Sequence, residues 1–148
     1  MSFSSAMKIT DVCVLVEDLD RAVNFYVNCL GFRLRRRAEG FADFHSEHIT
    51  LAAWQIDHIH AHCGVSNLRA PASVHKACIA VRLETPEEID AMYKNLTAMG
   101  VAFVSAPQDY VWNARCAYFT DPDDNVWEIY AWHEGGPKHD FDSEPNEK

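Results

Sequence analysis

The sequence predicts an α+β protein built from two copies of one βαβββ module, whose strands form a curved mixed sheet with a cavity. A strand–helix–strand–strand–strand order occurs in residues 8–56 and again in residues 74–132. In both halves, apolar residues alternate in the expected strands and recur every three to four residues in the expected helix. Such an internal repeat indicates the fold more strongly than any single motif.

The first module begins with the segment "KITDVCVLV", in which three valines at alternate positions share one strand face. Asp18 stands at the N-cap of a helix whose apolar stripe runs to Leu30, and Gly31 ends it. Three further strands are expected in "FRLRRR", "FADFH" and "ITLAAW". Because the helix packs on the valine face, the opposite face, with Asp11 and Cys13, is left to line the cavity.

The run "RRR" at residues 35–37 concentrates positive charge in an acidic chain. We interpret it as the solvent-exposed edge of a strand, and the alternative is a site for an anion. The formal net charge of the whole chain is −9, which argues against nucleic acid as a partner because its phosphates attract basic proteins. A cationic or neutral small molecule fits this charge better.

The second module begins with the strand "KACIAVRL", in which Cys78 and Arg82 share the face opposite the apolar one. Thr85 and Glu88 have the spacing of a capping box, and Gly100 ends the helix that follows. The remaining strands are expected in "VAFVSA", "NARCAYFT" and "NVWEIYAW". This order repeats that of the first module.

Aromatic residues are frequent in the second half of the chain. Alternation assigns Trp127 to the core, while Glu128, Tyr130 and Trp132 share the other strand face. Tyr130, Trp132 and Trp112 either line the cavity or simply fill the structure. As lining residues they would suit a flat or cationic ligand.

Four passages together resemble the vicinal oxygen chelate superfamily, which includes glyoxalase I, extradiol dioxygenases and bleomycin-binding proteins. They are "VLVEDLDRAVNFYVNCLGFRL", "VRLETPEEIDAMYKNLTAMGVAF", "WNAR" and "FTDPDDNVWEIY". The last is similar to the family's DPDGN-x-x-E, with Asp124 in place of glycine. The resemblance spans residues 8–132 as one domain, and it implies a small-molecule cavity, Arg115 near that cavity, and a homodimer.

In the metal-using members of that family, the ion lies in the cavity and is bound from the first and last strands of each module. The matching positions in this chain are Asp11, Ala52 (or Thr50 with a shifted gap), Cys78 and Glu128. Only Glu128 has the usual ligand type, because Asp11 and Cys78 stand where histidine is usual. The resemblance therefore implies a degenerate metal site, although these two residues and Glu128 could together bind a divalent ion.

Two functions remain open. We favour a metal-free protein resembling the bleomycin-binding type, in which cavity acids and tryptophans hold a cationic aromatic compound. Without a metal ion, the acids would be held by hydrogen bonds or by Arg82 or Arg115. The alternative is a metal-dependent lyase, isomerase, transferase or dioxygenase for a small oxygenated substrate, with Glu128 as metal ligand or catalytic base. Whether the protein is an enzyme is left open. The candidate ligand-binding residues are Asp11, Cys13, Trp54, Cys78, Arg82, Trp112, Arg115 and Tyr130.

The segment "DHIHAHC" lies in the linker expected at residues 57–73 and carries three histidines at alternate positions. They are His58, His60 and His62. We interpret the linker as a polar surface or a dimer contact. The alternative is a transition-metal site that His45 and His48 could join.

The five cysteines are scattered and include no CxxC pair, which predicts reduced thiols in a cytoplasmic protein. No apolar run approaches the roughly 20 residues of a membrane helix, and residues 1–6 lack the apolar stretch of a secretory signal. Residues 134–148 are rich in acids, Gly and Pro without apolar periodicity, and are expected to form a mobile tail.

Overall fold

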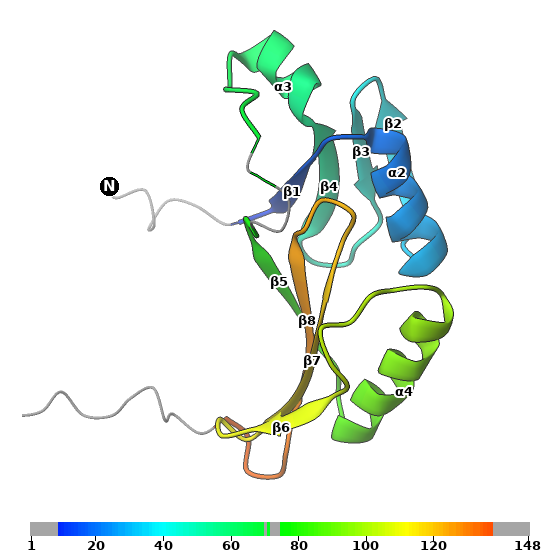
Figure 1. Cartoon of the computed structure of the whole chain (residues 1–148), viewed down its shortest axis with the longest axis vertical. Helices are drawn as coiled ribbons and strands as arrows, with labels where there is room; N and C mark the ends of the chain where they lie inside the picture. The colour runs from blue at the N-terminus through cyan, green and yellow to red at the C-terminus, as the bar shows by residue number, and fades with distance from the viewer. Residues whose placement is uncertain (1–8, 70, 72–74, 138–148) are drawn as a thin grey trace, which may run out of the picture. The chain divides into compact units, whose positions relative to one another are not determined.

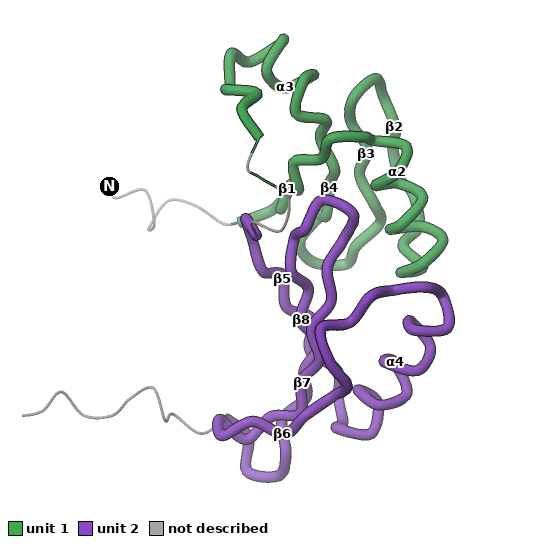
Figure 2. The backbone as a smooth tube through the Cα atoms, viewed as in Figure 1, with its two compact units in different colours: residues 1–74 green, residues 75–148 purple. Residues whose placement is uncertain are grey.

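The computed structural model describes residues 9–69, 71 and 75–137. The chain divides into two compact units, residues 1–74 and 75–148 (Figure 2). Each unit contains its own four-stranded mixed sheet. The predicted α+β fold is therefore confirmed. Most of the expected acidic tail, from residue 138 onward, lies outside the described residues.

The first unit has a sheet of strand order β1-β4-β3-β2, in which β1 and β4 are parallel and the other pairs are antiparallel (Figure 1). Its strands are β1 (Asp11–Val16), β2 (Leu34–Ala38), β3 (Phe41–Phe44) and β4 (Thr50–Gln55). Its helices are α2 (Leu19–Asn24), the π-helical turn η1 (Phe25–Cys29) and α3 (Ile56–Cys63). The helix expected between the first two strands is thus split into an α-helical and a π-helical part.

The second unit repeats this arrangement with the strand order β5-β8-β7-β6, and β5 and β8 are parallel. Its strands are β5 (Cys78–Arg82), β6 (Gln108–Tyr110), β7 (Ala114–Thr120) and β8 (Val126–Trp132). Helix α4 (Pro86–Ala98) lies on one face of this sheet (Figure 1). The other face of the sheet carries the residues discussed below.

The strand faces follow the alternation of the sequence. In each unit the apolar side of the sheet is buried and forms the core. The buried residues include Val14, Val16, Tyr26, Phe44 and Ala53 in the first unit and Ile89, Phe119, Trp127, Ile129 and Ala131 in the second. Trp127 stacks on Phe119 with 6.2 Å between the ring centroids, which confirms its predicted core position.

The predicted helix caps are present. Asp18 Oδ1 accepts a hydrogen bond of 3.0 Å from the backbone N–H of Arg21 at the start of α2. Thr85 and Glu88 form the expected capping box at the start of α4. Both caps satisfy backbone N–H groups that would otherwise lack a partner inside the helix.

Two expectations were wrong at the level of single elements. The segment "VAFVSA" forms no strand; Phe103 alone makes an isolated bridge to Phe119, and the outer strand is β6 instead. No helix was expected between the two modules, but the linker begins as the helix α3, and Gly64, with φ +70°, supplies its left-handed C-cap. Among the described residues, no helix has the length and hydropathy needed to span a membrane.

Candidate functional site

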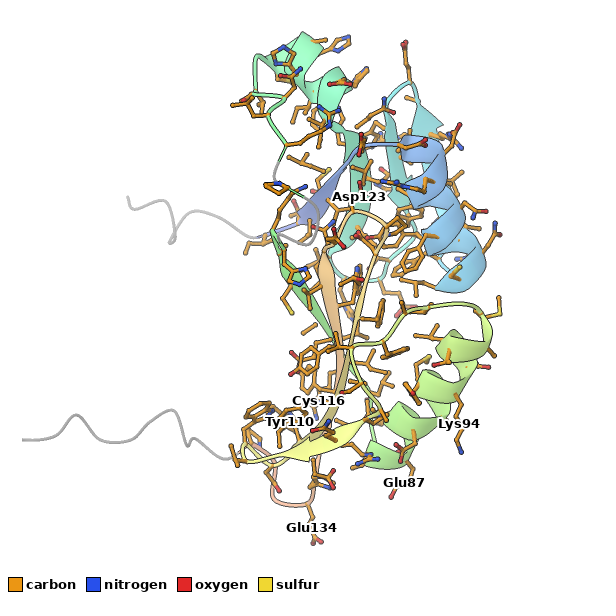
Figure 3. The ribbon with its side chains drawn as sticks, viewed as in Figure 1. Glu87, Lys94, Tyr110, Cys116, Asp123 and Glu134 are labelled. Atoms are coloured by element: carbon orange, nitrogen blue, oxygen red, sulfur yellow. The ribbon has the colours of Figure 1, made fainter. Side chains whose placement is uncertain are left out.

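Glu128 occupies the middle of the sheet face that α4 leaves uncovered in the second unit. In the register of the sheet it lies opposite Ala80 of β5 and Tyr118 of β7. Along β8, burial alternates, so that Glu128 and Tyr130 are half-buried between fully buried neighbours. Figure 3 shows Tyr110 and Cys116 on this same side of the sheet, away from Glu87 and Lys94 on α4.

Aromatic rings surround this face. Tyr110 at the end of β6 stacks on Trp112 with 4.5 Å between the centroids, and meets Tyr118 edge to face at 6.0 Å. Tyr130 and Trp132 of β8 form a second edge-to-face pair at 5.3 Å. The aromatic side chains expected either to line a cavity or to fill the structure therefore gather on one sheet face. We call this group the aromatic–acid cluster; it consists of Glu128, Cys116, Tyr110, Trp112, Tyr118, Tyr130 and Trp132.

The electrostatics of the cluster centre on the carboxyl group of Glu128. Burial raises its pKa, and hydrogen bonds with the side chains of Cys116 and Tyr118 oppose that shift. Burial, followed by smaller contributions that include the charge of Glu128, raises the pKa of Cys116 to about 11. The same two causes raise the pKa of Tyr118 far above its ordinary value. Both neighbours therefore stay protonated at neutral pH and can donate to the carboxylate.

Glu128 has no cationic partner among the described residues. In the part of the chain that the structure describes, no Lys, Arg or His side chain forms an ion pair with it. A half-buried carboxylate without a cation is costly, and burial accordingly raises its pKa. Of the two expected ways to hold this acid, hydrogen bonds or an arginine, the structure has the hydrogen bonds, from Cys116 and Tyr118.

The two arginines lie elsewhere in the second unit. Arg115 donates to Asp90 of α4 from Nη2 at 2.7 Å and from Nε at 3.0 Å, and from Nη1 to Asp109 at 3.2 Å. Arg82, at the end of β5, lines a shallow depression together with Glu88 and Met92 of α4. Arg115 of β7 therefore links α4 to the sheet through Asp90, while Asp109 belongs to β6 of the sheet itself.

Cys78 lies near the aromatic–acid cluster without being part of its centre. The sheet register pairs it with Val126, so that Glu128 is its diagonal neighbour. Partial burial raises the pKa of its thiol, and the nearby charge of Glu128 raises it further. Cys78 is thus a protonated thiol at neutral pH rather than a thiolate.

In the first unit, Asp11, Cys13 and Trp54 also lie on the sheet face away from α2, as alternation predicts. Asp11 accepts a hydrogen bond of 2.7 Å from the hydroxyl of Thr10. Burial of the Cys13 thiol, with a smaller effect of Asp11, raises the pKa of that thiol to about 11. Trp54 packs edge to face against Phe41, with 5.7 Å between the centroids.

Sequence reasoning missed a buried acid on this same face. Asp43 of β3 is only 1% exposed, and its carboxylate binds both Arg35 and Arg36 of β2. The sequence does contain a signal for this acid. Asp43 and Phe41 are alternate residues of one strand, so they share a face, and a tight turn joins this strand to the arginine run. A charged residue at an inward position opposite two arginines indicates an ion pair. The predicted solvent-exposed strand edge is also confirmed, because β2 is the outer strand of its sheet and all five of its residues are exposed.

The histidines of "DHIHAHC" are placed by α3. His58 and His62 are one helical turn apart, and their rings stack at 4.0 Å. Trp54 Nε1–H donates to His58 Nδ1 at 3.0 Å, so a neutral His58 carries its proton on Nε2. His62 Nδ1–H donates to the His58 carbonyl at 2.9 Å. The two facing rings therefore offer one lone pair and one N–H group, which does not suit a shared metal ion.

The donor residues of the predicted metal site are a poor fit for a metal ion. Within residues 9–69, 71 and 75–137, no three His, Cys, Asp or Glu side chains are grouped so that they could hold a metal ion. The second-unit donors are one acid and one protonated thiol, which is a poor match for the imidazole and carboxylate ligands that such an ion prefers. The set Asp11, Cys78 and Glu128 takes residues from both units and stays a prediction.

The comparisons with known proteins agree with this architecture. The sequence pattern of the Glyoxalase/Bleomycin resistance protein/Dioxygenase superfamily matches residues 8–129. The chain therefore belongs to this superfamily. A glyoxalase/bleomycin resistance protein/dioxygenase from Nocardioides is 42% identical, with a TM-score of 0.84, over 91% of this chain and 93% of that one.

More distant solved structures share the fold. A glyoxalase/bleomycin resistance protein/dioxygenase family enzyme from Burkholderia phytofirmans PsJN has a TM-score of 0.74 at 17% identity, over 86% of this chain and 100% of that one. A lactoylglutathione lyase from Agrobacterium tumefaciens has a TM-score of 0.68 at 17% identity, over 84% and 92% of the two chains. No curated protein matches the sequence.

Proposed function

We propose that this protein binds a cationic aromatic small molecule, without a metal ion, at the aromatic–acid cluster. The observation that carries this proposal is an acid without a cationic partner among the described side chains. Glu128 is half-buried and lies beside Tyr118, whose ring belongs to a group of aromatic contacts on the same sheet face. A ligand with a positive charge would supply the missing partner.

The physical argument has two parts. A carboxylate that has already lost part of its hydration gains more from an arriving cation than an exposed one does, because water screens the pair less. Aromatic faces also attract cations, by about 0.5–2 kcal/mol for each favourable contact. Tyr110, Trp112 and Tyr130 offer such faces beside the acid. Arg115 is not part of the proposed site, because its guanidinium is already bound by two acids.

A titration with proflavine, a flat cationic aromatic compound, tests the proposal. We expect saturable binding, measured by calorimetry and by quenching of tryptophan fluorescence. Glu128→Gln removes the charge but keeps an acceptor, and should weaken binding by about tenfold or more. Glu87→Gln is the matched control, since it removes the same charge from α4 on the other side of the sheet (Figure 3).

Two results would contradict the proposal. One is the absence of saturable binding, and the other is equal binding by the Glu128→Gln and Glu87→Gln variants. Metal content forms a separate test: untagged protein exposed to Zn²⁺, Mn²⁺, Fe²⁺ and Ni²⁺ and then desalted should retain no ion. An ion near one per chain that is lost in the Asp11→Ala/Glu128→Ala variant would favour the metal-dependent enzyme instead.

A further inference from the structure

The first unit contains a second charged group on the sheet face away from α2. The buried carboxylate of Asp43 accepts hydrogen bonds from Arg35 Nε at 3.0 Å and from Arg35 Nη2 at 2.7 Å. Arg36 Nη2 adds a third hydrogen bond at 2.8 Å. One acid therefore holds two neighbouring guanidinium groups, and we call these three residues the arginine pair and its anchor.

A backbone irregularity makes this arrangement possible. Consecutive side chains of a regular strand point to opposite faces, so Arg35 and Arg36 should not reach the same carboxylate. The register between β2 and β3 shifts between Leu34 and Arg36, and this bulge turns both arginines toward Asp43. Bulges that redirect a side chain are frequent next to functional sites.

The outer side of this group is wholly cationic. Asp43 is 1% exposed, whereas the side chains of Arg35 and Arg36 are 44% and 66% exposed. Together they carry two positive charges and one negative charge. Each guanidinium has five N–H groups, and most of them form no hydrogen bond within the described part of the chain. These donors face solvent.

Phe41 and Asp11 also interact with the two arginines. The guanidinium of Arg36 lies over the ring of Phe41, 5.8 Å from its centroid, which restricts its position further. The charge of Asp11 also acts on Arg35, but the carboxylate of Asp11 accepts a hydrogen bond from Thr10 and forms no ion pair with either arginine. The anchor therefore remains Asp43.

We propose that Arg35 and Arg36 bind an oxyanion, the carboxylate or phosphate group of a small molecule, and that Asp43 positions both guanidinium groups for it. The planar fork of arginine matches both anions with paired hydrogen bonds. Because Asp43 and Phe41 already hold the side chains, binding costs less ordering than two free surface arginines would require. This site is separate from Glu128, and it does not rest on the function proposed above.

Phosphate and acetate are the probes, each titrated at constant ionic strength against sodium chloride and followed by thermal shift and by the NMR signal of the Arg35 Nε–H. We expect saturable binding by the wild-type protein. Arg36→Gln should weaken it by about tenfold or more, while Arg35 keeps its paired bond to Asp43. Arg37→Gln is the matched control, since Arg37 lies on the same strand but pairs with Asp20. The probe that binds more tightly identifies the anion class.

Asp43→Asn separates positioning from charge. Removing the acid makes the site more positive, so a purely electrostatic attraction predicts tighter phosphate binding, whereas lost positioning predicts weaker binding. Weaker binding supports the proposal, and tighter binding overturns the role of Asp43. If that variant does not fold, Arg36→Gln still decides: equal phosphate affinity in the Arg36→Gln and Arg37→Gln variants overturns the site. Unchanged phosphate binding by Glu128→Gln shows that the two sites are independent.

Discussion

The imidazole of His58 lies directly against the backbone of Gly40, so closely that a β-carbon on residue 40 would be 2.4 Å from His58 Cγ. Gly40 forms the turn between β2 and β3, and its φ of +68° is in the left-handed region. Trp54 holds the same histidine through its indole N–H, at 3.0 Å. The first turn of α3 thus packs against the turn of the β2–β3 hairpin, at a position where only glycine fits.

Gly40→Ala should therefore destabilise the protein by two separate effects. The left-handed backbone costs a non-glycine residue about 1–2 kcal/mol, and the collision with His58 adds a cost typical of overpacking, about 1–3 kcal/mol. Gly31→Ala is the matched control, because Gly31 has φ +77° but its added β-carbon would meet no atom of the described chain within 4 Å. Urea unfolding of both variants measures the difference.

A double-mutant cycle isolates the contact. In a His58→Gly background, Gly40→Ala should cost no more than Gly31→Ala, because both the imidazole and the β-carbon of residue 58, which collide with the new β-carbon, are then absent. Equal losses for Gly40→Ala and Gly31→Ala in the wild-type background would show that His58 simply moves aside.

Acid pH should weaken the first unit through Asp43. The hydrogen bond from Arg35, with a smaller effect of Arg36, holds the pKa of this carboxyl below its usual 3.8. An acid whose pKa is lowered by folding stabilises the protein above its unfolded pKa, and the stabilisation is lost as the pH falls through the folded pKa. At pH 7, Asp43→Asn should lower the free energy of unfolding by about 1.5–3 kcal/mol, as for hydrogen bonds to charged groups.

The difference in unfolding free energy between wild type and Asp43→Asn should therefore shrink from pH 5 to pH 2. Chemical denaturation at several pH values measures it. Asp20→Asn is the control, since Asp20 also pairs with an arginine but is largely exposed. A pH dependence in Asp43→Asn that matches wild type would assign the acid sensitivity to other groups.

The parts of the fold that follow from local chemistry could be predicted from the sequence. Alternation placed Glu128 and Trp127 on opposite faces of β8, and side-chain capping placed the starts of α2 and α4. These features depend on neighbours in the chain. The aromatic residues of the candidate site were found for the same reason.

The errors concern features set by contacts between distant segments. The apolar run "VAFVSA" alternates like a strand, yet the edge of the sheet is taken by β6, whose position is fixed by the short turn into β7. Arg115 is held by Asp90, 25 residues away, and no local pattern shows that contact. The helix α3 was missed although Asp57 in its first turn and Gly64 at its end are ordinary helix signals.

The capping box of α4 gives a prediction of stability alone. Thr85→Ala removes the acceptor for the backbone N–H of Glu88 and should cost about 1 kcal/mol, within a range of about 0.5–2 kcal/mol. Thr97→Ala changes the same residue type on an exposed position of the last turn of α4 and should be nearly neutral. Urea unfolding compares the two. A similar loss in both variants would contradict a specific capping effect.

Glu128 should show the opposite pH behaviour from Asp43, because burial raises rather than lowers its pKa. An acid of this kind is costly to the fold in its charged form, so stability falls as the pH rises from its unfolded pKa through its folded pKa. Gln keeps the acceptor for Cys116 and Tyr118 without the charge. Glu128→Gln should therefore melt at a higher temperature than wild type at pH 7.5, by about 2–4 °C for each kcal/mol removed, and at the same temperature near pH 3.

A cationic ligand should reduce or reverse the difference in melting temperature between Glu128→Gln and wild type. Proflavine stabilises whichever protein binds it, in proportion to the logarithm of its concentration over Kd. Wild type should therefore gain more than Glu128→Gln in a thermal shift series, and the gap in melting temperature should close or change sign as proflavine rises. Glu87→Gln should follow wild type throughout, since its carboxylate lies on α4. A constant gap at every proflavine concentration would mean that the charge of Glu128 weakens the fold without serving this ligand.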